Sequence, residues 1–129
     1  MDQFNAFLQA LESGGGRFSQ SAAILVCFLA YGGFRKSEAA NVKWADVNEK
    51  RGFIAVHGDE VLGTKTEASR RQVPIIDPMR DLLVKLRARS GKVNVSDRVM
   101  PIRECQKAMN RAAKVVGMTR ITHHDLRHG

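Results

Sequence analysis

Cysteine, proline and long apolar runs are scarce in this sequence, and each scarcity excludes a class of protein. The two cysteines, Cys27 and Cys105, stand outside any pattern of metal-ligand spacing, which argues against a zinc site and fits a reducing compartment. Three prolines and 43% hydrophobic residues favour a globular chain over a disordered one. The longest apolar run, residues 22–31, is too short to span a bilayer, and an amphipathic stretch follows Met1 in place of a signal peptide. We therefore expect a cytoplasmic protein.

Negative charge is also scarce, above all in the second half of the chain. Residues 1–64 carry 6 basic and 7 acidic side chains, whereas residues 65–129 carry 15 basic and 6 acidic ones. The net charge of +8 therefore comes from one half, which favours a polyanionic partner such as nucleic acid. A solvated basic surface without a partner is the alternative. The length of 129 residues suits one domain with a modest core.

The periodicity of apolar residues predicts helices at both ends of the chain and strands between them. We expect helices from Asp2 to the glycines at 14–16, then at residues 20–31, 36–42, 78–89 and 101–117, with a last helix starting at residue 123. Strands are expected at residues 53–57, 61–66 and 71–76, and Pro74 predicts an edge position or a strand end for the third. This order predicts an α+β fold that is mainly α, with helices packed around a small three-stranded antiparallel sheet.

Caps and apolar faces support these helices. Ser19 and Asp77 precede the second and fourth helices as expected caps, and Pro78 suits a first helical position. The second helix is apolar nearly all round, which predicts that it is buried. Two helices have one apolar face each, formed in the first helix by Phe4, Phe7, Leu8 and Leu11 and in the fifth by Cys105, Ala108, Met109, Ala112 and Val116.

The first segment that carries chemistry is residues 33–38. Arg35 stands at the entrance to a predicted helix, where free backbone N–H groups favour an anion. Its guanidinium can hold two phosphate oxygens at once. Glu38, three residues later, can brace the loop or the helix. An ordinary Arg–Glu pair on the surface is the alternative for this segment.

The second segment, residues 63–71, carries Lys65 beside the tip of a predicted hairpin. A lysine there can reach a base in the minor groove of DNA and can protonate a leaving oxygen. The alternative is a charge on an edge strand that discourages aggregation.

The third segment is residues 122–128. His124 and Arg127 are three residues apart, so they share one face of a helix and offer a phosphate two donors. Asp125 lies off that face and can orient a neighbour or cap the turn. His124 and His128 are the one pair of histidines at helical spacing, but Arg127 beside them would repel a cation. We therefore expect no metal ion.

Taken in this order, the three segments resemble the catalytic domain of the tyrosine recombinases, also called phage integrases. The matching stretches are GFRKSEAANVKWADV at 33–47, TKTEASRRQVPI at 64–75 and HDLRH at 124–128. The resemblance implies DNA strand breakage and rejoining through a 3′-phosphotyrosyl bond, with no cofactor. It implies that Arg35 and Arg127 clamp the phosphate, that Lys65 is the general acid, and that His124 donates to a phosphate oxygen. Three neighbours would support these catalytic residues: Glu38, Asp125 and His128.

The sequence departs from the family pattern after the third segment, where a further His or Trp and the tyrosine nucleophile should follow. The only tyrosine, Tyr31, matches no nucleophile position. We expect it to pack in the core with its hydroxyl reaching a helix end. The resemblance thus predicts that residues 1–129 are a partial catalytic domain, without the N-terminal DNA-binding domain and the nucleophile helices.

Such a partial domain is expected to bind double-stranded DNA but not to cleave it alone. We also expect self-association or association with other recombinase subunits, one of which can donate the tyrosine. Two alternatives remain at this stage: a non-catalytic DNA-binding remnant, and a strand transferase that resembles type IB topoisomerases.

Overall fold

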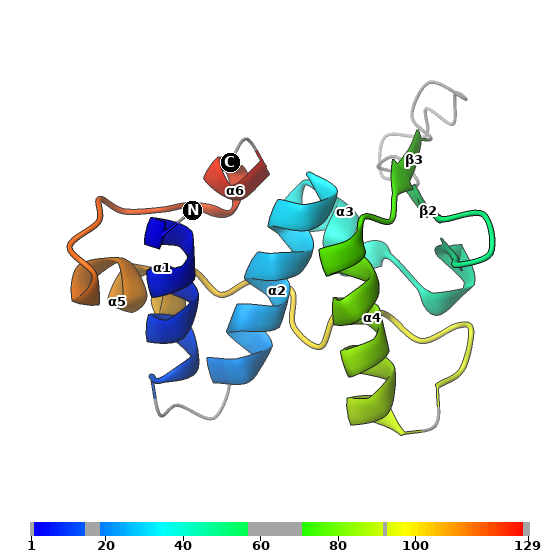
Figure 1. Cartoon of the computed structure of the whole chain (residues 1–129), viewed down its shortest axis with the longest axis horizontal. Coiled ribbons are helices and arrows are strands. Elements are labelled where there is room, and N and C mark those ends of the chain that lie inside the picture. Colours follow the sequence, from blue (N-terminus) through cyan, green and yellow to red (C-terminus); the bar gives the residue numbers. More distant parts are fainter. Residues whose placement is uncertain (1, 15–18, 57–70, 92, 128–129) are drawn as a thin grey trace.

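The computed structural model describes residues 2–14, 19–56, 71–91 and 93–127 (Figure 1). The described chain is mainly helical with a small three-stranded antiparallel sheet, which confirms the predicted fold class. Its elements in order are α1 (Asp2–Glu12), α2 (Ser19–Gly32), α3 (Lys36–Asn41), the 3₁₀ turn η1 (Trp44–Asp46), β1 (Val47–Asn48), β2 (Phe53–Val56), β3 (Arg71–Pro74), α4 (Asp77–Ser90), α5 (Gln106–Val115) and α6 (His123–Arg127).

Helix α2 is the centre of the fold, and Figure 1 shows it between α1 and α4. It contacts α1, α3, α4, α5 and α6. Leu25, Val26, Phe28 and Leu29 are fully buried, although they lie on different sides of the helix. A helix that is apolar on every side is stable only when other elements cover it on every side. The prediction of a buried second helix is therefore confirmed.

The apolar face of α1 lies in the core as predicted. Phe7 and Leu11 are buried, and Phe4 and Leu8 pack partly buried against the same cluster. The helix bears on both α2 and α5. Its spacing of three and four residues therefore places one stripe of side chains against two neighbouring helices.

Helix α5 starts later than the sequence suggested. The predicted range was 101–117, but the helix runs over Gln106–Val115. The helix was expected to start near Pro101, yet the chain stays irregular as far as Cys105, whose backbone N–H donates to the His123 ring. Gly117, with φ of 71°, lies beyond the end of the helix. Met109 and Ala112 are buried as predicted, whereas Ala108 and Val116 are only half-buried.

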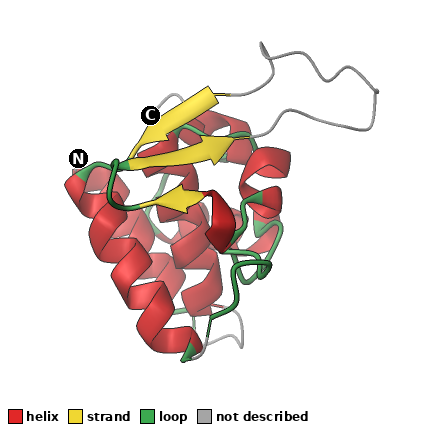
Figure 2. Cartoon of the chain, turned by 90° about the vertical axis from the view of Figure 1, so that its right-hand side faces the viewer, coloured by secondary structure: helices red, strands yellow, loops and turns green. Residues whose placement is uncertain are grey.

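The sheet lies at one end of the molecule beside α3 and α4 (Figures 1 and 2). Its strand order is β1-β2-β3, and Phe53 pairs with Pro74 across the β2–β3 ladder. Pro74 is the last residue of an edge strand, as predicted, because a residue without an N–H cannot continue a ladder. The strand β1 was not predicted, since two residues are too few to show alternation. The strand expected at residues 61–66 lies outside the described residues.

Helix α4 runs over Asp77–Ser90, close to the predicted 78–89, but its cap differs from the prediction. The residue before the helix is Ile76, and Asp77 lies within the first turn, where its carboxylate still faces the positive end of the helix. Arg87 joins α4 to the sheet side of the molecule. Its guanidinium lies 4.8 Å from the centre of the Trp44 ring and 3.0 Å from the Glu49 carboxylate.

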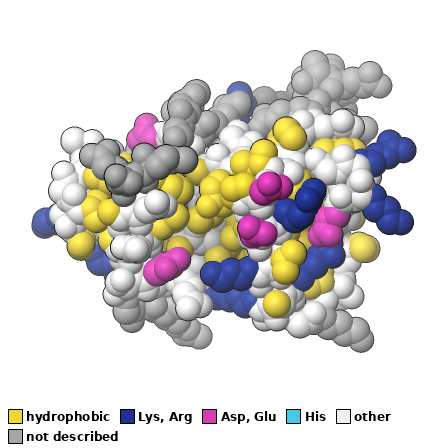
Figure 3. Space-filling view, in the orientation of Figure 1, with side chains coloured by type: hydrophobic (Ala, Val, Ile, Leu, Met, Phe, Trp, Pro, Cys, Tyr) yellow, Lys and Arg dark blue, Asp and Glu magenta, His cyan; other side chains and the backbone are white. Residues whose placement is uncertain are grey.

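The surface of the face seen in Figure 1 is mixed. Figure 3 shows hydrophobic side chains exposed among basic and acidic ones across this face. Within the part of the chain that the structure describes, no helix is both long and apolar enough to cross a membrane.

Candidate functional site

Arg35 stands at the turn between α2 and α3. Gly33 has φ of 64°, a left-handed conformation that glycine adopts without steric cost, and it redirects the chain after α2. Phe34 follows, fully buried, with its ring stacked on Phe28 at a centroid distance of 4.6 Å. This anchor fixes the backbone just before Arg35, which is exposed and immediately precedes the first residue of α3. The sequence correctly predicted Arg35 at a helix entrance.

Glu38 braces that entrance, as the sequence suggested. The backbone N–H of Arg35 donates to Oε1 of Glu38 at 2.8 Å. Such a bond satisfies one of the N–H groups that the start of a helix leaves without a partner. Ala39, the next residue, is buried and holds α3 against the core. The entrance of α3 is therefore fixed from two sides, and Arg35 projects from it.

Helix α6 carries the third segment, and two reciprocal hydrogen bonds close its first turn. The backbone N–H of Thr122 donates to Oδ2 of Asp125 at 2.8 Å, and the N–H of Asp125 lies 3.3 Å from Oγ1 of Thr122. Asp125 thus caps the turn, one of the two roles predicted for it. The backbone of His124 and Arg127 lies in this helix. Their side chains are outside the part that the structure describes.

His123 is a structural residue that the sequence analysis missed. Its side chain is only 7% exposed, and its Nε2 accepts a hydrogen bond from the backbone N–H of Cys105 at 3.0 Å. Burial lowers the pKa of His123 below 6.5, the Lys36 ammonium lowers it further, and Glu104 partly opposes both. One signal could have found it: His123 and the buried Leu126 are three residues apart, so they share the inner face of α6.

The first and third segments lie close together in the fold. Helix α6 packs against α2, and Lys36 at the start of α3 is near enough to His123 to affect its pKa. Arg35 directly precedes Lys36, and His124 directly follows His123. The two segments are thus near each other, both packed against α2, although about 90 residues separate them in the chain. Lys65 and His128 lie outside the described residues.

A basic pocket adjoins this place. Its cavity volume is about 290 Å³, and it lies between α3 and the segment that leads into α5. Six residues line it: Lys36, Ser37, Ala40, Asn41, Arg103 and Glu104. Two cations against one carboxylate give the pocket a positive balance, which raises the local preference for an anion.

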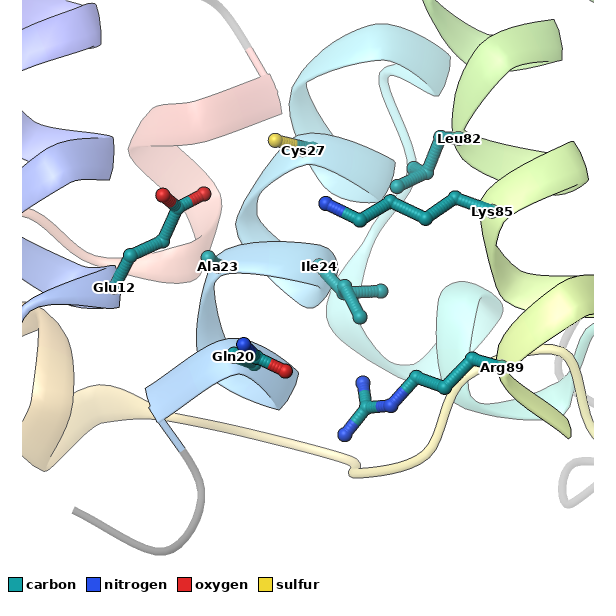
Figure 4. A pocket seen from close by; sticks show the side chains of 8 residues that line it. All are labelled: Glu12, Gln20, Ala23, Ile24, Cys27, Leu82, Lys85 and Arg89. Carbon is teal, nitrogen blue, oxygen red and sulfur yellow. The ribbon is translucent and has the colours of Figure 1, made fainter. Parts of the chain in front are cut away.

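A second pocket lies farther along α2, away from Arg35. Figure 4 shows Lys85 reaching from α4 toward α2, with Arg89 one turn later on the same side. Glu12 of α1 and Cys27 of α2 also line this cavity of about 150 Å³. Arg89 donates to Oγ of Ser21 at 3.2 Å, so part of its donor capacity is used within the fold.

Tyr31 packs against the core as predicted, but its hydroxyl has a different partner from the one expected. It hydrogen-bonds Cys27, one turn earlier in α2, whereas a helix end was predicted. Burial, helped by Cys27, raises the pKa of Tyr31 to about 12. The spacing of four residues places both side chains on one side of α2, which explains the pairing.

Among the described residues, no group of three or more His, Cys, Asp or Glu side chains is arranged to hold a metal ion. Cys27 and Cys105 are both free thiols. Burial raises the pKa of each, that of Cys105 to about 12, so neither thiol is ionised near neutral pH.

The fold is similar to those of solved recombinases and integrases. The XerA recombinase superposes with a TM-score of 0.67 and 22% identity, covering 98% of this chain and 46% of that one. The integrase of transposon Tn1549, in complex with circular intermediate DNA, superposes with a TM-score of 0.70 and 16% identity, covering 98% of this chain and 50% of that one. The lambda integrase catalytic core superposes with a TM-score of 0.68 and 17% identity, covering 98% of this chain and 76% of that one. The chain thus spans about half the length of the first two proteins.

These identities are too low to carry more than the fold. A comparison with curated protein sequences found no match. The family model described as the phage integrase family, however, matches residues 1–129, the whole of this sequence. It therefore spans all three segments, including the stretch that carries Lys65. On this match, the chain belongs to the phage integrase family.

Proposed function

We propose that residues 1–129 are part of the catalytic domain of a tyrosine recombinase that integrates or recombines double-stranded DNA. One observation carries the proposal: α3, which Arg35 precedes, and α6, which contains His124, both pack against α2, and Lys36 of α3 is near enough to His123 of α6 to lower its pKa. Solved integrases of similar fold are bound to DNA, and one is a lambda integrase tetramer on a Holliday junction. We include DNA and further recombinase subunits among the partners of this chain.

In this proposal the site binds one phosphate of the DNA backbone. Arg35 and Arg127 hold the non-bridging oxygens and stabilise the charge that builds up in the pentavalent state. His124 donates to a phosphate oxygen, and Lys65 protonates the leaving 5′ oxygen. Glu38 and Asp125 hold the two helix starts in place, and His128 is assigned to the same supporting set.

The attacking tyrosine has to come from outside these 129 residues. Tyr31 is partly buried in α2, its hydroxyl is bonded to Cys27, and its pKa is raised to about 12. A nucleophilic tyrosine needs the opposite environment: its hydroxyl oxygen must be accessible to the substrate and must lie beside a group that accepts its proton. We therefore assign Tyr31 to packing and infer that residues 1–129 bind DNA without cutting it.

Replacement of the two arginines tests the phosphate site. We expect Arg35→Ala and Arg127→Ala each to weaken binding of a labelled DNA duplex roughly ten-fold, because each removes a charge-assisted bond to phosphate. Fluorescence anisotropy at several salt concentrations measures the affinity, and each variant should also show a shallower salt dependence.

Arg111→Ala is the matched control for this experiment. Arg111 is exposed on α5 and packs beside Gly14, at the end of α1 far from α3 and α6 in Figure 1. The Arg111→Ala substitution removes the same charge from a different place, so its effect on DNA affinity should be much smaller. Equal losses from all three substitutions would show that the chain attracts DNA by its overall charge and would refute the site.

A further inference from the structure

His123 joins the start of α6 to the segment before α5 through one hydrogen bond. Its Nε2 lies 3.0 Å from the backbone N of Cys105 and accepts that N–H. A neutral imidazole has one nitrogen that accepts and one that carries the proton, so an accepting Nε2 requires the proton on Nδ1. An imidazolium has protons on both nitrogens and cannot accept. This bond therefore exists only while His123 is neutral.

The surroundings of His123 favour the neutral ring. Lys36 on α3 repels a positive charge there, and Glu104 just before α5 is the opposing anion. Helix α2, against which α6 packs, has neither an acidic nor a basic residue. Its ionisable groups, Cys27 and Tyr31, have pKa values raised by burial and stay uncharged near neutral pH. The thiol of Cys105 is uncharged for the same reason.

Helix α6 depends on such outside contacts. Its five residues are too few for a helix that is stable on its own. The Thr122–Asp125 cap is a contact within the helix turn itself. Among the described side chains of α6, Leu126 and His123 are the two that are buried against the rest of the protein. Leu126 contributes apolar contact, which has no direction. The His123 bond is directional, so it can fix the rotation of the helix about its axis.

We propose that His123 is a positioning residue: its neutral ring anchors α6 to Cys105 and so sets where His124 and Arg127 project. The statement about His124 and Arg127 rests on the proposed function, whereas the anchor itself does not. Protonation of His123 would break the anchor. The fold would then have a built-in dependence of the phosphate site on pH that is separate from the titration of His124.

The anchor is tested first without DNA. Nitrogen-15 NMR of the wild-type ring should show Nδ1 protonated and Nε2 unprotonated at neutral pH. The Cys105 amide should exchange with solvent roughly ten-fold or more faster in His123→Phe, because a buried donor loses its partner. His123→Gln offers an amide oxygen near the place of Nε2 and should retain most of the protection.

The pH dependence gives a second readout. Because the folded pKa of His123 lies below 6.5, its contribution to folding stability is complete above pH 6.5 and is lost as the pH falls through the folded pKa. The unfolding free energy of the wild type should therefore fall more between pH 7 and acidic pH than that of His123→Gln. The other three histidines are present in both proteins, so their titrations cancel.

DNA affinity gives the third readout. The ratio of wild-type to His123→Gln affinity for the same labelled duplex should fall over the same acidic range. A ring protonated on Nε2 at neutral pH, or equal Cys105 exchange in wild type and His123→Phe, would overturn the anchor. If Arg35→Ala and Arg127→Ala leave DNA affinity unchanged, the proposed function fails. The ring tautomer, the exchange rate of the Cys105 amide and the unfolding free energies then still show whether His123 anchors α6.

Discussion

The hydroxyl of Tyr31 is turned back onto its own helix. It bonds the thiol of Cys27 and lies in a partly buried position against the core. The sequence could predict the packing role, because Tyr31 lies in an apolar helix and matches no nucleophile position. It could not predict the partner, since a helix end and a side chain one turn away are equally within reach of a tyrosine hydroxyl.

The titration of Tyr31 checks this environment. Absorbance of the tyrosinate reports one residue, because the sequence has one tyrosine, and the midpoint should lie near 12 instead of the ordinary 10.0. Cys27→Ala should lower the midpoint but leave it above 10, since burial is the larger cause of the shift. A raised pKa means that stability contributed by Tyr31 is complete below pH 10 and is lost as the pH rises through about 12. A wild-type midpoint at 10 would contradict the buried, bonded hydroxyl.

His123 shows where prediction from sequence fails at this scale. Its partner, the Cys105 N–H, lies eighteen residues away in the chain and is brought close only by the packing of α6 on α2. Among three histidines within six residues, the sequence pointed to His124 as a phosphate donor, and the spacing of three residues between His123 and the apolar Leu126 was the one local signal of burial. The positions of Arg35 and Asp125 were easier to predict, since helix starts have local signals.

Helix α3 has only six residues, so its entrance decides whether it forms. The Arg35 N–H and Glu38 Oε1 are 2.8 Å apart across that entrance. The same arrangement that starts the helix also sets the direction in which Arg35 leaves the backbone. Local stability and the presentation of Arg35 therefore depend on one carboxylate.

Glu38→Ala tests this dependence. We expect the unfolding free energy to fall by about 1 kcal/mol, the usual size of the loss when a helix start loses its side-chain acceptor. Glu38→Gln keeps an acceptor oxygen and should cost clearly less. Urea denaturation followed by circular dichroism measures both. If Gln is as damaging as Ala, the charge of Glu38 at the positive end of α3 matters instead of the hydrogen bond.

The elements that were predicted best are those with signals along their whole length. Helix α2, expected at 20–31, runs over Ser19–Gly32, and α4 ends one residue beyond the predicted range. Errors arose where a distant contact or shortness decided the outcome. Helix α5 begins five residues after Pro101, past Cys105, whose N–H is bonded to His123, and β1 exists only because its two residues pair with β2.

The charge of the whole molecule favours DNA, but charge alone does not make a cutting enzyme. The net charge of +8 attracts a polyanion, and the proposed phosphate site would stabilise a transition state. Neither starts the reaction, because the chain's one tyrosine is partly buried and its hydroxyl is bonded to Cys27. Binding and cleavage should therefore be separable in this protein.

A nicked suicide substrate tests that separation. We expect residues 1–129 to bind the substrate and to give no covalent protein–DNA adduct on a denaturing gel, with a complete integrase on its own site as the positive control. Addition of a family fragment that carries the nucleophilic tyrosine should restore the adduct if this tyrosine can be supplied from outside. An adduct formed by the chain alone and lost in Tyr31→Phe would make Tyr31 the nucleophile after all.

The central place of α2 has a consequence for synthesis on the ribosome. Its covering helix α6 begins about 90 residues after α2 ends, and at roughly 5–20 residues per second that interval lasts roughly 5–18 seconds. During this time α1, and later α3, α4 and α5 as they emerge, can cover parts of this nearly all-apolar helix, but the side that α6 covers stays open. The nascent chain thus exposes apolar side chains of α2 until α6 has been made. Chaperones that hold apolar nascent segments should bind this stretch first.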